Sequence, residues 1–199
     1  MQHICLGVVT RQRPEGVIRL MRSFSSLRVP DNVSCTVLIV ENESVSTLTK
    51  RRSEIEDILP FPVQIVLEKD IGIPSARNRA LDIALAGGFD FLTFVDDDQI
   101  VDEYWLLMLY TSAKLRNLDL VGGPRGMTPD EDSRLSWMNR LVFEAFRKRT
   151  SGFDSKRFLA AFSDEEYEVR VHTNNWMVRL CTLRSLGIRF DVAFRQAGG

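Results

Sequence analysis

Short, continuous apolar runs alternate with amphipathic helical patterns over most of the first 121 residues, and no other feature of the sequence constrains the fold as strongly. Runs without polar alternation indicate strands that are buried on both faces. Pro14 and Pro74 suit the first turns of two helices between these runs. The alternation predicts an α/β fold in which helices cover both faces of a mostly parallel sheet. The expected strands are residues 4–9, 35–40, 63–67, 91–95 and 118–121.

The residues after 121 have a different pattern. A loop rich in glycine, proline and acidic residues at 122–132 precedes a basic amphipathic helix pattern at 134–149 and a strand-like run at 167–171. A chain of 199 residues has the length of one domain. We therefore expect a single domain over residues 1–199, in which residues 122–199 form a cap at one end of the sheet.

The charge balance gives no general attraction to nucleic acid, because 26 Lys and Arg stand against 27 Asp and Glu, for a formal net charge of -1. The N-terminus lacks a signal-peptide pattern, and no apolar run approaches the roughly 20 residues of a membrane helix. Cys5, Cys35 and Cys181 lie in apolar stretches, which suits buried, reduced thiols. These observations predict a cytoplasmic protein without a nucleic-acid partner.

Asp96, Asp97 and Asp98 follow a buried strand pattern at its carboxyl end. Three adjacent carboxylates repel one another unless a cation is bound among them. Mg²⁺ and Mn²⁺ prefer carboxylate oxygens and share their other ligand positions with phosphates. The alternative is a solvated acidic turn that caps the following helix. Because the preceding strand is buried, we favour a metal and diphosphate site.

Polar groups also follow the first three predicted strands, at residues 10–14, 41–44 and 68–79. Sheets of this kind bind ligands at the carboxyl ends of their strands. The third of these segments contains Gly72 and opens a helix, whose first N–H groups are free to bind an anion. From its spacing, Arg77 is either a ligand of a phosphate or carboxylate or a surface arginine. Together the strand ends predict a nucleotide site.

These motifs resemble, in kind and in order, those of family-two inverting glycosyltransferases, which have the Rossmann-like GT-A fold. The matching segments are residues 10–14, 40–42, 72–78 and 95–98, followed by 172–179, 186–191 and 198–199 on the acceptor side. The acceptor-side segments are similar to those of bacterial exopolysaccharide enzymes. The resemblance implies a nucleotide-sugar-binding half at residues 1–121 and a partial acceptor-side half at residues 122–199. It also implies inverting transfer from a nucleoside-diphosphate sugar, preferably a UDP-sugar, to a saccharide or lipid-linked acceptor.

The resemblance carries roles to individual residues of the donor site. Thr10 and Glu41 would hold the base and ribose, with Glu41 in place of the family's usual Asp, and Arg77 would orient the first carboxylate or a phosphate. The residues implied in nucleotide binding are Thr10, Arg13, Glu41, Arg77, Asp96 and Asp97. Asp98, with Asp96, would bind Mn²⁺ or Mg²⁺.

On the acceptor side the resemblance implies roles for Asn174, Asn175 and Trp176. The family's general base often follows a Gly-Gly pair, and this chain ends at Gly199. We therefore expect the base directly after Gly199 in a longer chain, and poor transfer by the chain as it stands. Asp191 and Glu165 are the alternatives within the sequence.

Three further alternatives remain open. A nucleotidyltransferase also combines a nucleotide with carboxylates and a divalent ion, but it favours a Gly-rich loop, and residues 10–16 contain one Gly. A non-catalytic nucleotide-sugar-binding module has the same donor site. The basic helix pattern at 134–149 predicts a core-packing helix with a solvated side, or peripheral contact with an anionic membrane at its inner face.

Overall fold

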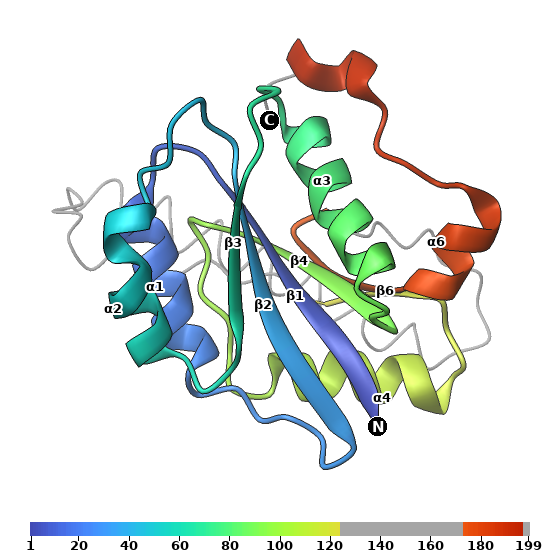
Figure 1. The fold of residues 1–199 in the computed structure, drawn as a ribbon. Helices are drawn as coiled ribbons and strands as arrows, with labels where there is room; N and C mark the ends of the chain where they lie inside the picture. The colour runs from blue at the N-terminus through green and yellow to red at the C-terminus, as the bar shows by residue number, and fades with distance from the viewer. Residues whose placement is uncertain (124–172, 197–199) are drawn as a thin grey trace, which may run out of the picture. The chain divides into compact units, whose positions relative to one another are not determined.

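The computed structural model describes residues 1–123 and 173–196. The chain divides into two compact units, residues 1–121 with 172–199, and residues 122–171. The fold given below is that of the first unit (Figure 1). The predicted helix at 134–149, the predicted strand at 167–171 and most of the predicted loop at 122–132 lie outside the described residues.

The centre of the unit is a six-stranded sheet in the order β3-β2-β1-β4-β6-β5. Strands β1, β2, β3 and β4 are parallel, and β6 runs antiparallel to β4. The strands are β1 (Gln2–Thr10), β2 (Val33–Glu41), β3 (Val63–Leu67), β4 (Phe91–Asp96), β5 (Leu120–Gly122) and β6 (Asn175–Arg179). The predicted mostly parallel sheet is confirmed, and β6 adds a strand that the apolar runs did not indicate.

Helices cover both faces of the sheet, as the alternation predicted. Helices α1 (Pro14–Phe24), α2 (Arg52–Ile58) and α4 (Trp105–Leu115) contribute to one buried cluster with the side chains of Ile4, Leu6 and Val8. Figure 1 shows α3 (Ile73–Ala86) and α6 (Leu180–Leu186) on the opposite side from α1 and α2. Short 3-10 turns occupy Thr49–Arg51 and Val192–Gln196.

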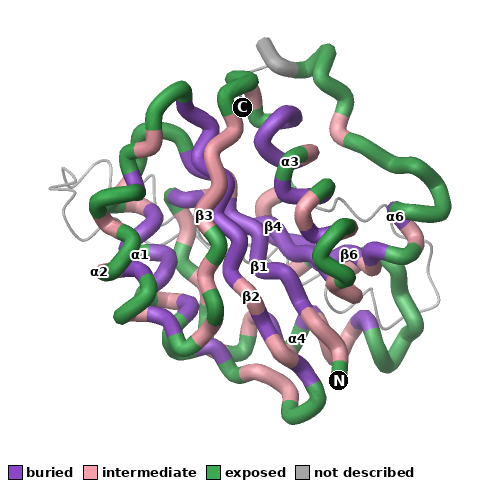
Figure 2. The backbone as a smooth tube through the Cα atoms, in the orientation of Figure 1, coloured by how far each residue is buried: buried purple, intermediate pink, exposed green. Residues whose placement is uncertain are grey.

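Strands β1, β2, β4 and β6 are mostly buried, because helices shield the middle of the sheet from both sides (Figure 2). Six of the nine β1 residues are buried, and every β4 residue up to Val95 is buried. A strand in this position cannot alternate polar and apolar residues without burying unpaired polar groups. This explains why the sequence of each central strand is a continuous apolar run.

The strand registers place the carboxyl ends of the central strands side by side. Thr10 at the end of β1 is paired with Glu41 at the end of β2, and Val9 is paired with Asp96 at the end of β4. On the far side of β2, Glu41 is paired with Leu67, the last residue of β3. Four strands therefore end at one edge of the sheet, and the polar residues that follow them must meet there.

The three cysteines are free, and two of them are buried in the sheet as expected. Burial raises the pKa of the Cys35 thiol to about 12 and raises that of Cys5 even further. The expectation of a buried thiol is wrong for Cys181, which is exposed. Helix α6 buries Leu180 and Leu183, so the intervening Cys181 faces away from the sheet.

Among the described residues, no helix has the length and apolar character needed to span a membrane.

Candidate functional site

A buried hydrogen bond joins the ends of β1 and β4. The Thr10 hydroxyl donates to Asp97 Oδ2 at 2.6 Å. Thr10 is 3% exposed and Asp97 is 4% exposed, so neither group can exchange this bond freely for water. In the strand order, β2 and β3 lie on one side of β1 and β4 lies on the other. This is the topological switch point at which open α/β sheets bind their ligands.

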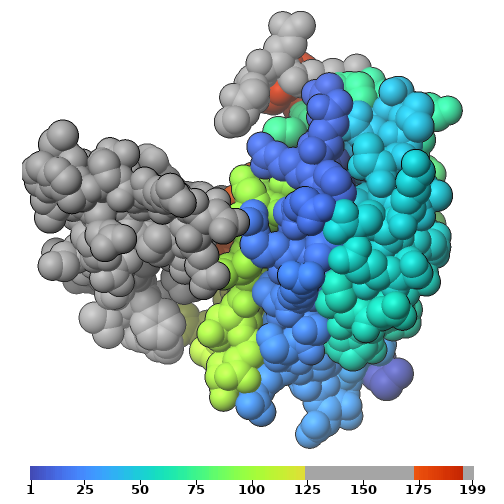
Figure 3. Space-filling view, turned by 90° about the vertical axis from the view of Figure 1, so that its left-hand side faces the viewer, coloured from blue at the N-terminus to red at the C-terminus, as the bar shows by residue number. Residues whose placement is uncertain are grey.

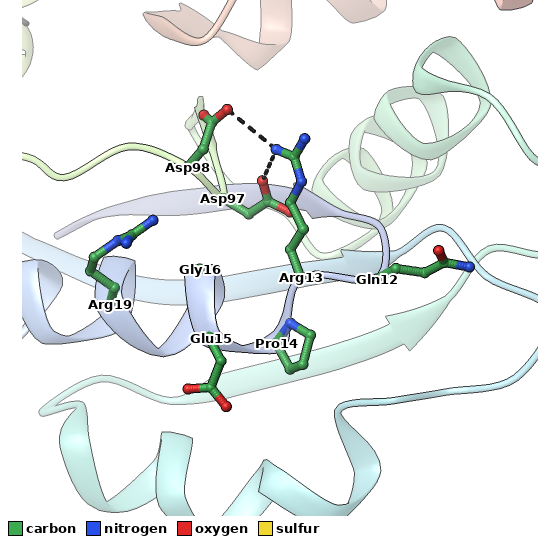
Figure 4. Close-up of a pocket in the computed structure, with 8 residues that line it drawn as sticks. All are labelled: Gln12, Arg13, Pro14, Glu15, Gly16, Arg19, Asp97 and Asp98. Carbon is green, nitrogen blue, oxygen red and sulfur yellow. Dashed lines mark hydrogen bonds and ion pairs between the residues drawn. The ribbon is translucent and has the colours of Figure 1, made fainter. Parts of the chain in front are cut away.

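Arg13 lies over the same carboxylate. Its Nη1 atom is 3.2 Å from Asp97 Oδ1 and 3.2 Å from Asp98 Oδ2, so one nitrogen bridges the two acidic side chains (Figure 4). The negative charge of Asp97, followed by its hydrogen bond and by the weaker influence of Asp98, raises the pKa of Arg13. Arg13 therefore stays a cation at this position under all ordinary conditions.

The start of α1 packs closely against the loop that follows β4. A Cβ atom at Gly16 would lie 2.5 Å from the backbone oxygen of Asp97, so only glycine permits this approach. In Figure 3 the first residues of α1, in blue, adjoin the yellow-green segment that follows β4. The close contact holds Arg13, which directly precedes α1, above the carboxylates.

A cavity of about 440 Å³ opens between this helix start and the carboxylates. Its size falls within the range of roughly 300–1,000 Å³ that is common for small-molecule sites. In Figure 4 the Arg13 and Asp98 side chains point toward one another. The lining residues are Gln12, Arg13, Pro14, Glu15, Gly16, Arg19, Asp97 and Asp98. Most of them carry charge or a polar group, which suits a charged ligand better than an apolar one.

Arg77 faces the first of the three carboxylates. Its Nη2 atom is 3.3 Å from Asp96 Oδ1, and its guanidinium carbon lies 5.8 Å from the ring centre of Phe94 and 5.7 Å from that of Phe190. Arg77 is only 9% exposed, so it is not the surface arginine of the alternative interpretation. Its Nε atom is buried without a hydrogen-bond partner among the described residues.

The carboxylate of Glu41 accepts hydrogen bonds from the loop that follows β2. Its oxygens accept hydrogen bonds from the Thr47 hydroxyl at 2.6 Å, from the Leu48 backbone N–H at 3.1 Å, and also from Ser46. With 1% exposure, Glu41 shapes the loop after β2. Contact of this carboxylate with a base or ribose stays a prediction.

The neighbouring Asn42 fixes the loop between β3 and α3. Its amide nitrogen donates to the backbone oxygens of Glu68 and Asp70, and its Oδ1 accepts from the N–H of Gly72 at 2.8 Å. Gly72 has a φ of 150°, which favours glycine, and α3 begins immediately after it. Asn42 belongs to a motif singled out from the sequence, yet its structural role had no local signal, since its partners lie about 30 residues away.

The acceptor-side candidates lie at the start of β6. Asn174 is half-buried, whereas Asn175 and Trp176 are buried. Asn175 Oδ1 accepts a hydrogen bond from Trp105, and Trp176 packs against the rings of Phe94 and Phe190. These contacts give Asn175 and Trp176 packing roles, and their contact with an acceptor stays a prediction.

Of the two alternative bases, Asp191 is exposed and Glu165 lies outside the described residues. The Asp191 carboxylate accepts a hydrogen bond from the Ala193 backbone N–H at 2.8 Å and caps the 3-10 turn that follows. Asp191 therefore has a local structural role.

Among residues 1–123 and 173–196, no group of three or more His, Cys, Asp or Glu side chains is arranged to hold a metal ion. The chemistry of the site nevertheless fits a hard divalent cation. Asp97 and Asp98 are carboxylates that already converge on a cationic nitrogen, and the Asp98 side chain is 59% exposed at the cavity. Hard cations of this kind need few protein ligands when a phosphate supplies the rest.

Comparison with known proteins agrees with the fold. The sequence model of glycosyl transferase family 2 matches residues 6–179. The succinoglycan biosynthesis protein ExoM of Rhizobium meliloti (strain 1021) is 31% identical over 199 residues, which cover 99% of this chain and 58% of that protein. The chain thus spans less than two thirds of this relative.

Two solved structures are also similar. S. aureus TarS 1-349 in complex with UDP has a TM-score of 0.67 at 15% identity, over 99% of this chain and 52% of the other. The mannosyltransferase PcManGT from Pyrobaculum calidifontis, in complex with GDP-Man and Mn²⁺, has a TM-score of 0.59 at 14% identity, over 92% and 46%. At these identities the structures show a shared GT-A fold.

The family match covers most of the chain, and the site lies at the sheet edge where this fold binds ligands. The chain belongs to glycosyl transferase family 2.

Proposed function

We propose that the protein transfers a sugar from a nucleoside-diphosphate sugar, preferably a UDP-sugar, to a saccharide or lipid-linked acceptor in polysaccharide biosynthesis. The transfer depends on Mn²⁺ or Mg²⁺ and inverts the anomeric configuration. The observation that carries this proposal is the meeting of Thr10, Arg13, Asp97 and Asp98 at the switch point of the sheet. The nucleotides named with the two solved structures and the succinoglycan role named for ExoM support the donor and the pathway class.

In this proposal the residues of the site bind and orient the donor. Thr10 and the loop shaped by Glu41 lie beside the nucleoside, while Arg77 and Asp96 lie beside the ribose and diphosphate. Arg77 keeps its orientation because its guanidinium lies against both the Phe94 and the Phe190 ring. Asp98, with Asp96, would hold the divalent ion, whose charge stabilises the leaving diphosphate when it is bound.

Inversion requires a proton acceptor for the attacking hydroxyl group on the acceptor. Asp191 is a weak candidate, because its carboxylate already accepts a backbone hydrogen bond. We place the base outside the described residues, directly after Gly199 in a longer chain. Loss of a positioned base lowers a rate by roughly 10²- to 10⁴-fold, so we expect the chain of 199 residues to bind donor and to transfer sugar poorly.

Isothermal titration with UDP, in the presence and absence of Mn²⁺, tests the proposal. We expect UDP to bind only with Mn²⁺, and Asp98→Asn to weaken this binding by at least about tenfold, because a charged ligand of the cation is lost. Asp57→Asn removes the same charge from an exposed position on α2 and serves as the control. Binding of UDP without metal, or no binding at all, contradicts the assignment.

A transfer assay distinguishes an enzyme from a module that only binds nucleotide sugar. The chain of 199 residues is compared with one that continues through its native following residues, using a UDP-sugar and saccharide acceptors. Gain of transfer on extension supports the proposal. Equal, robust turnover by both chains would show that the base lies within the 199 residues.

A further inference from the structure

Arg13 contacts two carboxylates, those of Asp97 and Asp98, which differ in their freedom to move. Asp97 is 4% exposed, and its second oxygen accepts the Thr10 hydroxyl, so this carboxylate is fixed. The Arg13 and Asp98 side chains are each 59% exposed. The contact between Arg13 and Asp97 therefore has one fixed partner, whereas both partners of the contact with Asp98 can leave it at little cost.

The bridging nitrogen also lies beside Asp98, the carboxylate that we propose as a ligand of the divalent ion. It lies 3.2 Å from an oxygen of each of two adjacent carboxylates. A guanidinium and a divalent cation cannot share this position, because like charges at such separations repel strongly. Any cation that takes Asp98 as a ligand must therefore displace Arg13 from it.

We propose that Arg13 is the resident cation of the Asp97–Asp98 pair, that it leaves Asp98 when a divalent ion enters, and that it then binds the donor diphosphate. This inference rests on the proposed function. Before the donor arrives, Arg13 neutralises the acidic pair and offsets the repulsion between its two carboxylates. Afterwards its planar guanidinium supplies paired N–H donors to phosphate oxygens, which a lysine ammonium cannot reproduce.

Arg13 can reach both the Asp98 carboxylate and the cavity without a change in the fold. The residue directly precedes α1, whose first turn is held against the loop after β4 by the close approach at Gly16. It also lines the 440 Å³ cavity together with Asp98. The Arg13 side chain is 59% exposed and already lines the cavity, so rotation about its own bonds can move the guanidinium away from Asp98.

Two measurements on Arg13→Gln should change in opposite directions. Without nucleotide, the affinity for Mn²⁺, followed by electron paramagnetic resonance of the free ion, should rise about three- to tenfold, because a competing cation is removed. With saturating Mn²⁺, the affinity for UDP should fall about tenfold or more, because a charge-assisted contact with the diphosphate is lost. Arg13→Lys should return the Mn²⁺ affinity to the lower value of the unchanged protein. It should recover the UDP affinity less fully.

Arg28→Gln is the matched control. It removes the same charge away from the cavity, from a side chain that is 58% exposed and whose ion pair is with Glu103. If the unchanged protein shows no Mn²⁺-dependent UDP binding, the proposed function fails. If it does, but Arg13→Gln behaves like Arg28→Gln, or lowers both affinities together, the inference about Arg13 is overturned. Circular dichroism of each variant confirms that the comparison is made on folded protein.

Discussion

At the scale of single residues, the site depends on the buried carboxylate of Asp97, both oxygens of which have a partner. Asp97 is buried, and an unpaired carboxylate there would be strongly destabilising. Thr10 satisfies one of its oxygens and Arg13 the other. The two neighbouring aspartates are more exposed and have fewer contacts, so they are available to a ligand. Asp97 therefore has a structural role, whereas Asp96 and Asp98 on either side of it in the chain can bind a ligand.

Replacement of Thr10 by Val should lower the free energy of unfolding by about 2 kcal/mol, because a hydrogen bond to a charged and buried acceptor is lost while the shape is kept. Thr10→Ser keeps the hydroxyl and should cost less. Urea denaturation monitored by tryptophan fluorescence measures both. Equal loss in the two variants would mean that the Thr10 methyl group, rather than its hydroxyl, stabilises this corner.

At the scale of elements, α3 connects the donor site to the C-terminal segment. The Asn78 side chain donates to the Phe190 backbone oxygen at 2.8 Å and accepts from the Phe190 N–H at 2.9 Å, as a neighbouring strand would. Further along the helix, Asp82 pairs with Arg189, and the Leu85 oxygen accepts from Arg184. These contacts hold the Phe190 ring against Arg77. Packing of the C-terminal segment thereby orients an arginine of the donor site.

Asn78→Ala should accelerate hydrogen exchange at the Phe190 amide by about tenfold or more, because two hydrogen bonds worth about 1 kcal/mol each are lost. The exposed Arg79→Ala, at the next position of α3, is the control. Exchange is followed by mass spectrometry of peptides that contain residues 187–194. Unchanged exchange in the Asn78 variant would contradict a holding role for this amide.

At the scale of the whole molecule, the sheet is completed by residues far along the chain. Strand β6 pairs with β4 over five residues, from the pair Phe91 and Arg179 to the pair Val95 and Asn175. Without β6, the edge of β4 and its buried side chains would meet water. The buried apolar residues that β6 and the following helix α6 contribute are Trp176, Met177, Val178, Leu180 and Leu183.

A chain that ends after residue 171 should fail to fold cooperatively, whereas one that ends after Leu186 should fold. Each buried apolar side chain stabilises by about 1.5–3 kcal/mol, so the five that are lost contribute as much as the whole stability of a typical domain. The two chains share every residue up to 171 and differ in β6 and α6. Thermal unfolding followed by circular dichroism compares them, and matching transitions would contradict this account of the sheet.

The sequence by itself determined the α/β class, the four parallel strands and the edge of the sheet at which the site lies. Continuous apolar runs are sufficient for this, because a strand buried on both faces leaves a pattern in its own residues. The acidic triplet and Arg77 could be singled out in the same way, since their residue types and their place after a strand or at a helix start are local.

Only the tertiary structure decided which groups at that edge meet. The bridge from Arg13 to Asp97 and Asp98 joins residues 84 and 85 positions apart, and the bond from Asn78 to Phe190 spans 112 positions. The apolar pattern likewise gave no sign that residues 175–179 would form a strand against β4, or that Glu41 would be used by its own loop. Such contacts depend on strand order and register, which are set when the sheet assembles, and neighbouring residues in the chain carry no record of them.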